Sequence, residues 1–234
     1  MMEAKDGSAI TDITPSALKT IYNGTPIEIE IDTNYPVEDR YTINVKTSKP
    51  VEFTIYVRVP SGADDILIDG AAGHTGFKTV KRIWNSDTKI DVSFSFSPKL
   101  EVQPDGMYAL WRGPLLYSVP IKERWEKREY THNGVERKFP YCDNEIFPET
   151  TWNYAFAGGE FKFNTHDIGN YPFSPDMPPV TITAPMAEIE WKMLNGVCEE
   201  KPDDNKAISD VQNIEMVPYG CTNLRMTQMP KIDN

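Results

Sequence analysis

The chain has 234 residues, of which 39% are hydrophobic and 25% are charged, and its formal net charge is −11. This length suits one large or two small domains with a sizeable core. The negative charge disfavours nucleic acid and anionic membrane surfaces as partners. No apolar run approaches the roughly 18 residues of a membrane-spanning helix, and the N-terminus lacks a signal-peptide pattern. We therefore expect a soluble chain, either cytoplasmic or exported by a signal outside this chain.

The first half of the sequence is dominated by alternating apolar and polar residues, which is typical of half-buried β-strands. Turn residues separate these runs, including Ser61-Gly62 and the hairpin dipeptide Asp69-Gly70. Short strands with turn signals between them predict an antiparallel sandwich rather than βαβ units. The expected strands cover residues 27–31, 41–45, 53–59, 66–68, 77–84 and 90–96.

The second half has a different character. Residues 121–140 are highly charged and predict either a short helix or a hairpin that turns at Asn133-Gly134. Residues 141–180 are rich in aromatic residues, Pro and Gly, which predicts long loops. Strands are expected to resume at residues 180–183, 187–193, 214–218 and 224–227. We therefore predict an all-β fold of two antiparallel, jelly-roll-like β-sandwiches in tandem, residues 1–120 with an N-terminal extension and the loop-rich residues 121–234.

Several segments along the chain carry a family resemblance. They are Thr33-Asn34-Tyr35-Pro36, Tyr56-Val57-Arg58-Val59-Pro60, the run Gly76–Val92 with Arg82, Trp84 and Asp87, Ala109-Leu110-Trp111-Arg112-Gly113-Pro114-Leu115-Leu116-Tyr117, Trp152-Asn153-Tyr154-Ala155, and Val217–Arg225 with Tyr219 and Gly220. In this order and spacing they resemble the C-terminal β-sandwich region of the β-L-arabinofuranosidase family, glycoside hydrolase family 127. Ser86 stands where that family has Gly, so we expect the turn there to differ.

Elementary chemistry assigns structural roles to the Pro and Gly residues of these motifs. Pro36 and Pro60 are expected to end strands, because proline cannot donate to the hydrogen-bond ladder. Gly113-Pro114 suits a tight bend between sheets. Gly220 is expected to adopt a backbone conformation that a Cβ would forbid.

The arginine in the third motif has two candidate partners. The Arg82 guanidinium is expected either to bind a carboxylate such as Asp87 or to stack on the indole of Trp84. Both roles are structural.

The resemblance implies a catalytic (α/α)6 barrel in full-length members, with a cysteine nucleophile in a zinc–thiolate centre built from Glu-x-Cys and Cys-Cys pairs. This sequence contains neither pattern. Its three cysteines form no C-x-x-C pair and are expected to be small buried residues, with one disulfide left open: Cys142, Cys198 and Cys221. The three histidines are isolated in loop-like contexts: His74, His132 and His166. We therefore expect no catalytic residue, no metal site and no cofactor in this chain.

The leading hypothesis is a non-catalytic accessory module in carbohydrate degradation. Its expected partner is a catalytic glycoside hydrolase barrel, in cis or in trans, or a second copy of the chain. The alternative is a carbohydrate-binding module for plant glycans, because sugar rings stack on exposed aromatic faces. The candidate contacts are Trp125, Trp152, Tyr154, Tyr171 and the neighbouring Phe173, with core or interface packing as the competing explanation. Core positions are expected for Trp84, Trp111 and Trp191.

Overall fold

The computed structural model describes residues 1–85 and 87–232, so the turn at Ser86 lies outside the described residues. The chain forms two compact units, Met1–Ser97 (unit 1) and Pro98–Asn234 (unit 2). The described residues form β-strands and one short 3-10 helix, η1 (Tyr219–Cys221), so the predicted all-β class is confirmed. None of the described residues belong to a helix long and apolar enough to cross a membrane.

The units divide at Ser97/Pro98 rather than near residue 120. The reason is strand pairing: β11 (Lys99–Val102), β12 (Tyr108–Arg112) and β13 (Leu115–Pro120) join a sheet whose other strands come from the end of the chain. These three strands pair with one another in sequence order, but the strands that join them to the rest of the sheet, β23, β24 and β25, lie about a hundred residues later.

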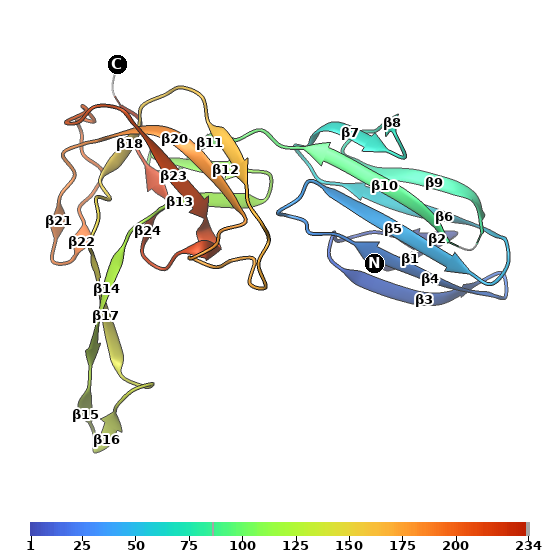
Figure 1. Ribbon diagram of the computed structural model, residues 1–234, viewed down its shortest axis with the longest axis horizontal. Coiled ribbons are helices and arrows are strands. Elements are labelled where there is room, and N and C mark those ends of the chain that lie inside the picture. The colour runs from blue at the N-terminus through green and yellow to red at the C-terminus, as the bar shows by residue number, and fades with distance from the viewer. Residues whose placement is uncertain (86, 233–234) are drawn as a thin grey trace. The chain divides into compact units, whose positions relative to one another are not determined.

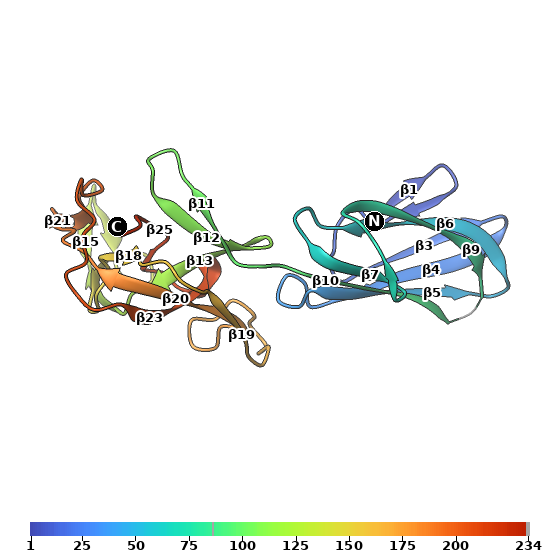
Figure 2. The same ribbon diagram turned by 90° about the horizontal axis from the view of Figure 1, so that it is seen from above.

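Unit 1 consists of two sheets with the core between them, so it is a β-sandwich (Figures 1 and 2). The smaller sheet has the order β1-β2-β6-β9. Its strands are β1 (Met2–Ala4), β2 (Gly7–Ala9), β6 (Val51–Val59) and β9 (Gly76–Trp84). The larger sheet has the order β3-β4-β5-β10-β7-β8. Its strands are β3 (Ser16–Tyr22), β4 (Thr25–Asp32), β5 (Arg40–Thr47), β10 (Thr88–Ser95), β7 (Asp64–Ile68) and β8 (Ala71–Ala72).

The alternation seen in the sequence produces the core of unit 1. Ile29 of β4 pairs with Val45 of β5, and both side chains are completely buried. From the opposite sheet, Ile55 and Val57 of β6 are also completely buried and belong to the same cluster. Each such side chain contributes about 2 kcal/mol through burial, which is what holds the two sheets together.

Trp84 ends β9 at the centre of this core and is completely buried. Its Nε1 donates to the backbone oxygen of Phe53 at 2.8 Å, and the two rings stack with centroids 5.3 Å apart. The Arg82 guanidinium carbon lies 4.3 Å from the Trp84 ring centroid. Arg82 forms an ion pair with Asp69, with Nη1 and Oδ2 3.2 Å apart, and not with Asp87. The pairing of β7 with β10 brings the turn at Asp69 close to Arg82. Asp87 instead occupies the turn before β10 with φ of 59°.

Unit 2 is built on a nine-stranded sheet with the main order β11-β12-β13-β23-β20-β18. Three further strands attach at its sides: β19 to β20, β24 to β13 and β25 to β12. The remaining bounds are β18 (Tyr154–Phe156), β19 (Lys162–Thr165), β20 (Val180–Glu188), β23 (Gln212–Pro218), β24 (Arg225–Met226) and β25 (Gln228–Met229). Strands β18 and β19 therefore occupy part of the segment where long loops were expected.

Three small hairpins complete unit 2. They pair β14 (Glu123–Arg128) with β17 (Asp143–Pro148), β15 (Tyr130–His132) with β16 (Val135–Arg137), and β21 (Met193–Leu194) with β22 (Val197–Cys198). Asn133 and Gly134 turn between β15 and β16 with φ of 50° and 78°. Positive φ at both central residues is the requirement of a type I′ hairpin turn, so of the two expected structures the hairpin is present.

Gly113 and Gly220 have structural roles that differ from those expected. Gly113-Pro114 connects β12 and β13 within one sheet rather than between sheets, because Arg112 pairs directly with Leu115. Gly220 lies in η1 outside the positive-φ region. A Cβ at Gly220 would lie 3.3 Å from Cδ1 of Phe173, so the residue permits a close side-chain approach rather than an unusual backbone conformation.

Candidate functional site

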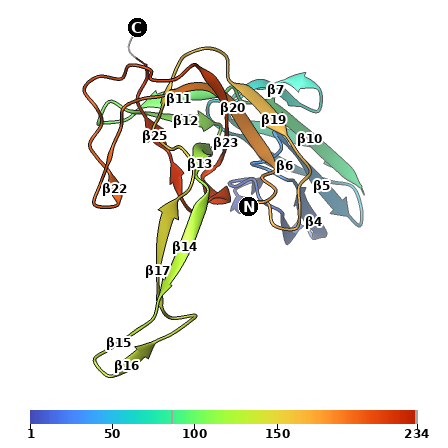
Figure 3. The ribbon, with the colours of Figure 1, turned by 60° about the vertical axis from the view of Figure 1, so that its left-hand side comes forward.

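A two-stranded ribbon is the most distinctive feature of unit 2. Strands β14 and β17 leave the nine-stranded sheet of their unit and carry β15 and β16 at their tip (Figures 1 and 3). We call residues 123–148 the arm. Isolated two-stranded ribbons are marginally stable in water, so contacts within the arm must hold it, and any uncovered apolar surface on it is available to a partner.

Glu123 anchors the base of the arm. Its carboxylate accepts hydrogen bonds from Asn223 Nδ2, from Trp125 Nε1 and from the backbone N–H of Leu224, each at 2.9 Å. Burial raises the pKa of Glu123, but these three hydrogen bonds outweigh it and leave the pKa below its ordinary value. The arm is therefore tied to the chain segment between η1 and β24, which belongs to one of the family-like motifs.

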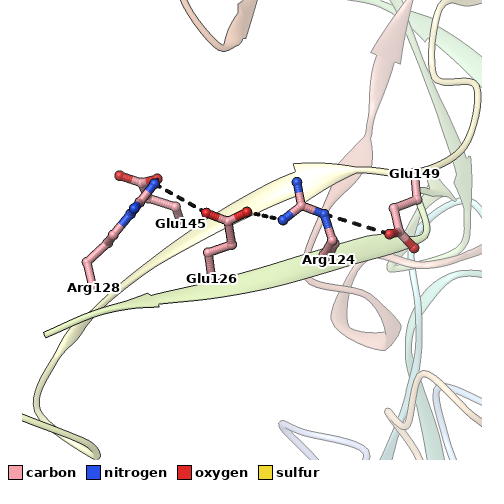
Figure 4. Close-up of polar contacts among 5 residues, drawn as sticks. All are labelled: Arg124, Glu126, Arg128, Glu145 and Glu149. Carbon is pink, nitrogen blue, oxygen red and sulfur yellow. Dashed lines mark hydrogen bonds and ion pairs between the residues drawn. The ribbon is translucent and has the colours of Figure 1, made fainter.

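One face of the arm is ionic. Residues paired across β14 and β17 share a face, and Arg124, Glu126 and Arg128 alternate along β14 opposite Phe147, Glu145 and Asp143. Figure 4 shows these charges in a continuous chain, with Arg128 on Glu126 at 3.2 Å and on Glu145 at 2.7 Å, Glu126 also on Arg124, and Arg124 on Glu149 at 3.9 Å. The side chains on this face satisfy one another.

The opposite face of the arm mixes apolar and polar side chains. Trp125 pairs with Ile146, Glu123 pairs with Pro148 and Lys127 pairs with Asn144, so an indole, a sec-butyl group and a pyrrolidine ring lie side by side near the base of the arm. Trp125 is 48% exposed even though its Nε1 is bonded to Glu123. Toward the tip, the Lys127 amine lies 4.0 Å from the Phe139 ring, which is itself 65% exposed. Trp125 and Phe139 therefore expose aromatic surface on this side of the arm.

The four sugar-contact candidates do not form one platform. Trp125 lies on the arm, whereas Trp152 packs on Trp191 with ring centroids 5.7 Å apart. Tyr154 is buried because β18 pairs with β20 in the main sheet, so its ring has no free face for a sugar. Tyr171 is 80% exposed in the loop between β19 and β20. Phe173, on the same loop, contacts the Gly220 position instead.

A polar pocket of about 650 Å³ lies beside that loop, next to Thr181 of β20 and Glu215 of β23. It is lined by residues of the loop and of the two strands: Thr165, His166, Asp167, Asp176, Met177, Pro178, Thr181 and Glu215. We expected His166 to be an isolated loop residue, and none of the three carboxylates of this pocket was predicted from the sequence. The sequence carries no signal for this grouping, because it depends on the pairing of β20 with β23.

The cysteines are all free thiols, with Cys142 and Cys221 buried and Cys198 exposed. The exposure of Cys198 differs from expectation, and it follows from the position of Cys198 at the end of the small β21–β22 hairpin. Burial raises the pKa of the Cys221 thiol to about 11, which is opposite to what an activated nucleophile needs. Within residues 1–85 and 87–232, no group of three or more His, Cys, Asp or Glu residues is arranged to hold a metal ion.

Comparison with known proteins identifies the region of the resemblance. Residues 11–96 match the family model described as the middle domain of β-L-arabinofuranosidase, glycoside hydrolase family 127. The predicted family resemblance is confirmed. No curated protein matches the chain by sequence.

Solved structures of glycoside hydrolases share the fold over nearly the whole chain. A family 127 β-L-arabinofuranosidase from Geobacillus stearothermophilus T6 matches 98% of the chain with a TM-score of 0.62 and 19% identity. A second family 127 β-arabinofuranosidase matches 96% with a TM-score of 0.55 and 15% identity, and a further glycoside hydrolase matches 97% with 0.52 and 13%. The chain covers 34%, 34% and 36% of these three structures, so it spans about a third of their length.

The family 127 middle-domain match falls within unit 1 and covers most of its two sheets. The arm and the polar pocket lie in unit 2, outside the matched residues. Similarity to a family 127 middle domain indicates an accessory region of a glycoside hydrolase.

Proposed function

We propose that this chain is a non-catalytic accessory module of a glycoside hydrolase, which supports a catalytic (α/α)6 barrel in carbohydrate degradation and docks on it through the arm. The observation that carries the proposal is the half-exposed indole of Trp125 beside Ile146, on a ribbon that extends from a family 127-like fold. The chain spans about a third of the glycoside hydrolases that it resembles, which supports a partner larger than itself.

The absence of the cysteine patterns expected of the resembled enzymes supports a non-catalytic role. The Glu-x-Cys and Cys-Cys patterns are absent from the sequence. Of the three cysteines, Cys221 is buried with a raised pKa, and Cys142 is also buried. A catalytic contribution from this chain would therefore need a different chemistry from that family's.

The size of the arm face that carries Trp125 and Ile146 favours a barrel over a second copy as the partner. Six residues in each of two strands give a face about 20 Å long and about 10 Å wide, or roughly 200 Å². A stable complex buries about 800 Å² on each side. The arm face alone is thus too small for a free dimer, whereas a partner held in cis, or held also by another surface, profits from a high effective concentration.

Affinity capture from the source-cell lysate tests this proposal. The full chain, a Trp125→Ala/Ile146→Ala double variant and an Ile83→Ala control serve as bait, with captured polypeptides identified by mass spectrometry. Ile83 is 60% exposed on β9 and lies outside the arm. The proposal expects a glycoside hydrolase with a catalytic barrel on the parent chain and on the control, and its loss from the double variant.

Two results would overturn the docking role. One is equal recovery of the hydrolase by the arm variant. The other is concentration-dependent self-association in sedimentation that the double variant abolishes, which would assign the arm to a second copy. Turnover of aryl arabinofuranosides by the purified chain would overturn the non-catalytic role.

A further inference from the structure

We infer that the polar pocket beside the β19–β20 loop binds a neutral saccharide, with Glu215 and the imidazole of His166 as hydrogen-bonding groups and Tyr171 as the ring at its rim. This site goes beyond the docking role, since it uses none of the arm residues. It lies beside β19 and β20, which pair at one edge of the unit 2 sheet (Figure 2).

The polar groups of the pocket are ordered by one buried hydroxyl. Thr181 is completely buried, and its Oγ1 donates to Glu215 Oε2 at 3.2 Å. The same oxygen lies 3.3 Å from His166 Nε2 and accepts from Asn164 Nδ2 at 3.3 Å. A hydroxyl has one proton, so the contact with His166 requires Nε2 to donate. The second Glu215 oxygen remains as an acceptor that faces the pocket.

The lining favours a polyhydroxyl ligand over an ion. Asp167, Asp176 and Glu215 supply carboxylates, yet among the described residues they do not converge as metal ligands would. No lysine or arginine is among the residues that line the pocket, so a phosphate or a uronic acid would meet only repulsion. Hydroxyl groups both donate and accept, and dispersed carboxylates beside an imidazole match them.

Apolar surface is available for the other side of a sugar ring. Met177 and Pro178 line the pocket, and Met177 is 55% exposed. Tyr171 lies on the loop between Asp167 and Asp176, both of which line the pocket, and its ring is 80% exposed. The C–H face of a saccharide packs on such apolar groups while its hydroxyls bond to carboxylates.

The loop is held in place from both ends of its sequence. Phe173 packs against the Gly220 position in η1, where a Cβ would lie 3.3 Å from its ring. Met177 Cε lies 3.7 Å from the position that a Cβ on Gly169 would occupy, so the two ends of the loop lie close together. The backbone N–H of His166 donates to the Pro179 oxygen at 2.8 Å and closes the loop at its base. These contacts restrain the loop that carries Asp167 and Asp176, which lowers the entropic cost of ordering it on binding.

Titration of the isotope-labelled full chain followed by amide NMR shifts tests the inference. The probes are L-arabinose, D-galactose and an oligosaccharide of each, with D-galacturonate as the anionic counterpart. We expect saturable shifts at residues 165–181 and 215 with at least one neutral sugar, and weaker binding of D-galacturonate, which the three carboxylates repel. Loss of one charged hydrogen bond in Glu215→Gln should weaken binding about tenfold.

The variants keep the test decisive. Glutamine retains an oxygen that accepts from Thr181, and Tyr171 is on the surface, so Glu215→Gln and Tyr171→Ala should both fold. Tyr171→Ala should also weaken binding, while Trp125→Ala on the arm should leave it unchanged. Absence of saturable shifts with every neutral sugar would overturn the inference, as would tighter binding of galacturonate, or equal affinity in Glu215→Gln.

Discussion

Replacement of Trp84 by phenylalanine probes the packing of unit 1 most sharply. Phenylalanine keeps a ring that can stack on Phe53 but removes the Nε1 proton, which donates to the Phe53 oxygen at 2.8 Å. Loss of this buried hydrogen bond costs about 1 kcal/mol. The smaller ring leaves a cavity of roughly 40 Å³, which costs about 1 kcal/mol more at about 24 cal/mol per Å³. We therefore expect Trp84→Phe to lower the free energy of unfolding of unit 1 by about 2 kcal/mol.

Native-state hydrogen exchange measures this value locally. Peptides from β6 and β9 should exchange roughly 30-fold faster in Trp84→Phe, because about 2 kcal/mol corresponds to that factor in the opening equilibrium. Trp125→Phe makes the same chemical change at a half-exposed ring and should change protection in these peptides by less than about 0.5 kcal/mol. Equal protection in Trp84→Phe and the parent chain would refute the reasoning, since the indole would then contribute neither packing nor a hydrogen bond.

Three further predictions follow from single contacts. Gly7→Ala should lower the thermal midpoint by several degrees, since a Cβ would lie 1.8 Å from the Thr54 oxygen and overpacking costs about 1–3 kcal/mol; an unchanged midpoint contradicts this. In the native chain near neutral pH, maleimide should modify the exposed Cys198 well before the buried Cys221, because burial raises the pKa of the Cys221 thiol to about 11. Peptide mapping that finds Cys221 modified first would contradict this. Hydrogen bonds, of which the one from the Thr54 hydroxyl is the strongest, lower the pKa of Asp6 in the folded chain. The Asp6 carboxylate therefore stabilises the fold at pH values above its unfolded pKa of about 4. This stabilisation is lost as the pH falls through the lower pKa of the folded state. The melting deficit of Asp6→Asn should accordingly shrink at low pH, and a constant deficit would refute the assignment.

Much of unit 1 follows from sequence because its strands alternate clearly. Ile29 and Ile31 alternate with glutamates, and the resulting strand buries one face against the other sheet. The Asp69-Gly70 turn was also recognisable from its dipeptide, and its residues have φ of 49° and 75°. The ion pair of Arg82 was not, because it depends on the pairing of β10 with β7 and not on proximity to Asp87 in sequence.

Unit 2 is less predictable because its contacts join distant segments. Glu123 at the base of the arm is bonded to Asn223 and Leu224, a hundred residues further along the chain. The burial of Tyr154 depends on the register of β18 against β20, and local sequence gives no sign of that register. Residues 123–128 alternate so that Arg124, Glu126 and Arg128 lie on one face of the arm and Trp125 lies on the other. This division is recognisable only once the segment is known to form a two-stranded ribbon.

A photo-crosslink from the arm tests the central claim most directly. A photoreactive phenylalanine analogue replaces Trp125 on the arm in one variant and Ile83 on β9 in another, and each is illuminated in source-cell lysate. The account predicts that position 125 forms an adduct with the catalytic barrel of a glycoside hydrolase and that position 83 does not. An adduct of the same barrel at equal yield from both positions, or adducts from position 125 that contain no glycoside hydrolase, would contradict it.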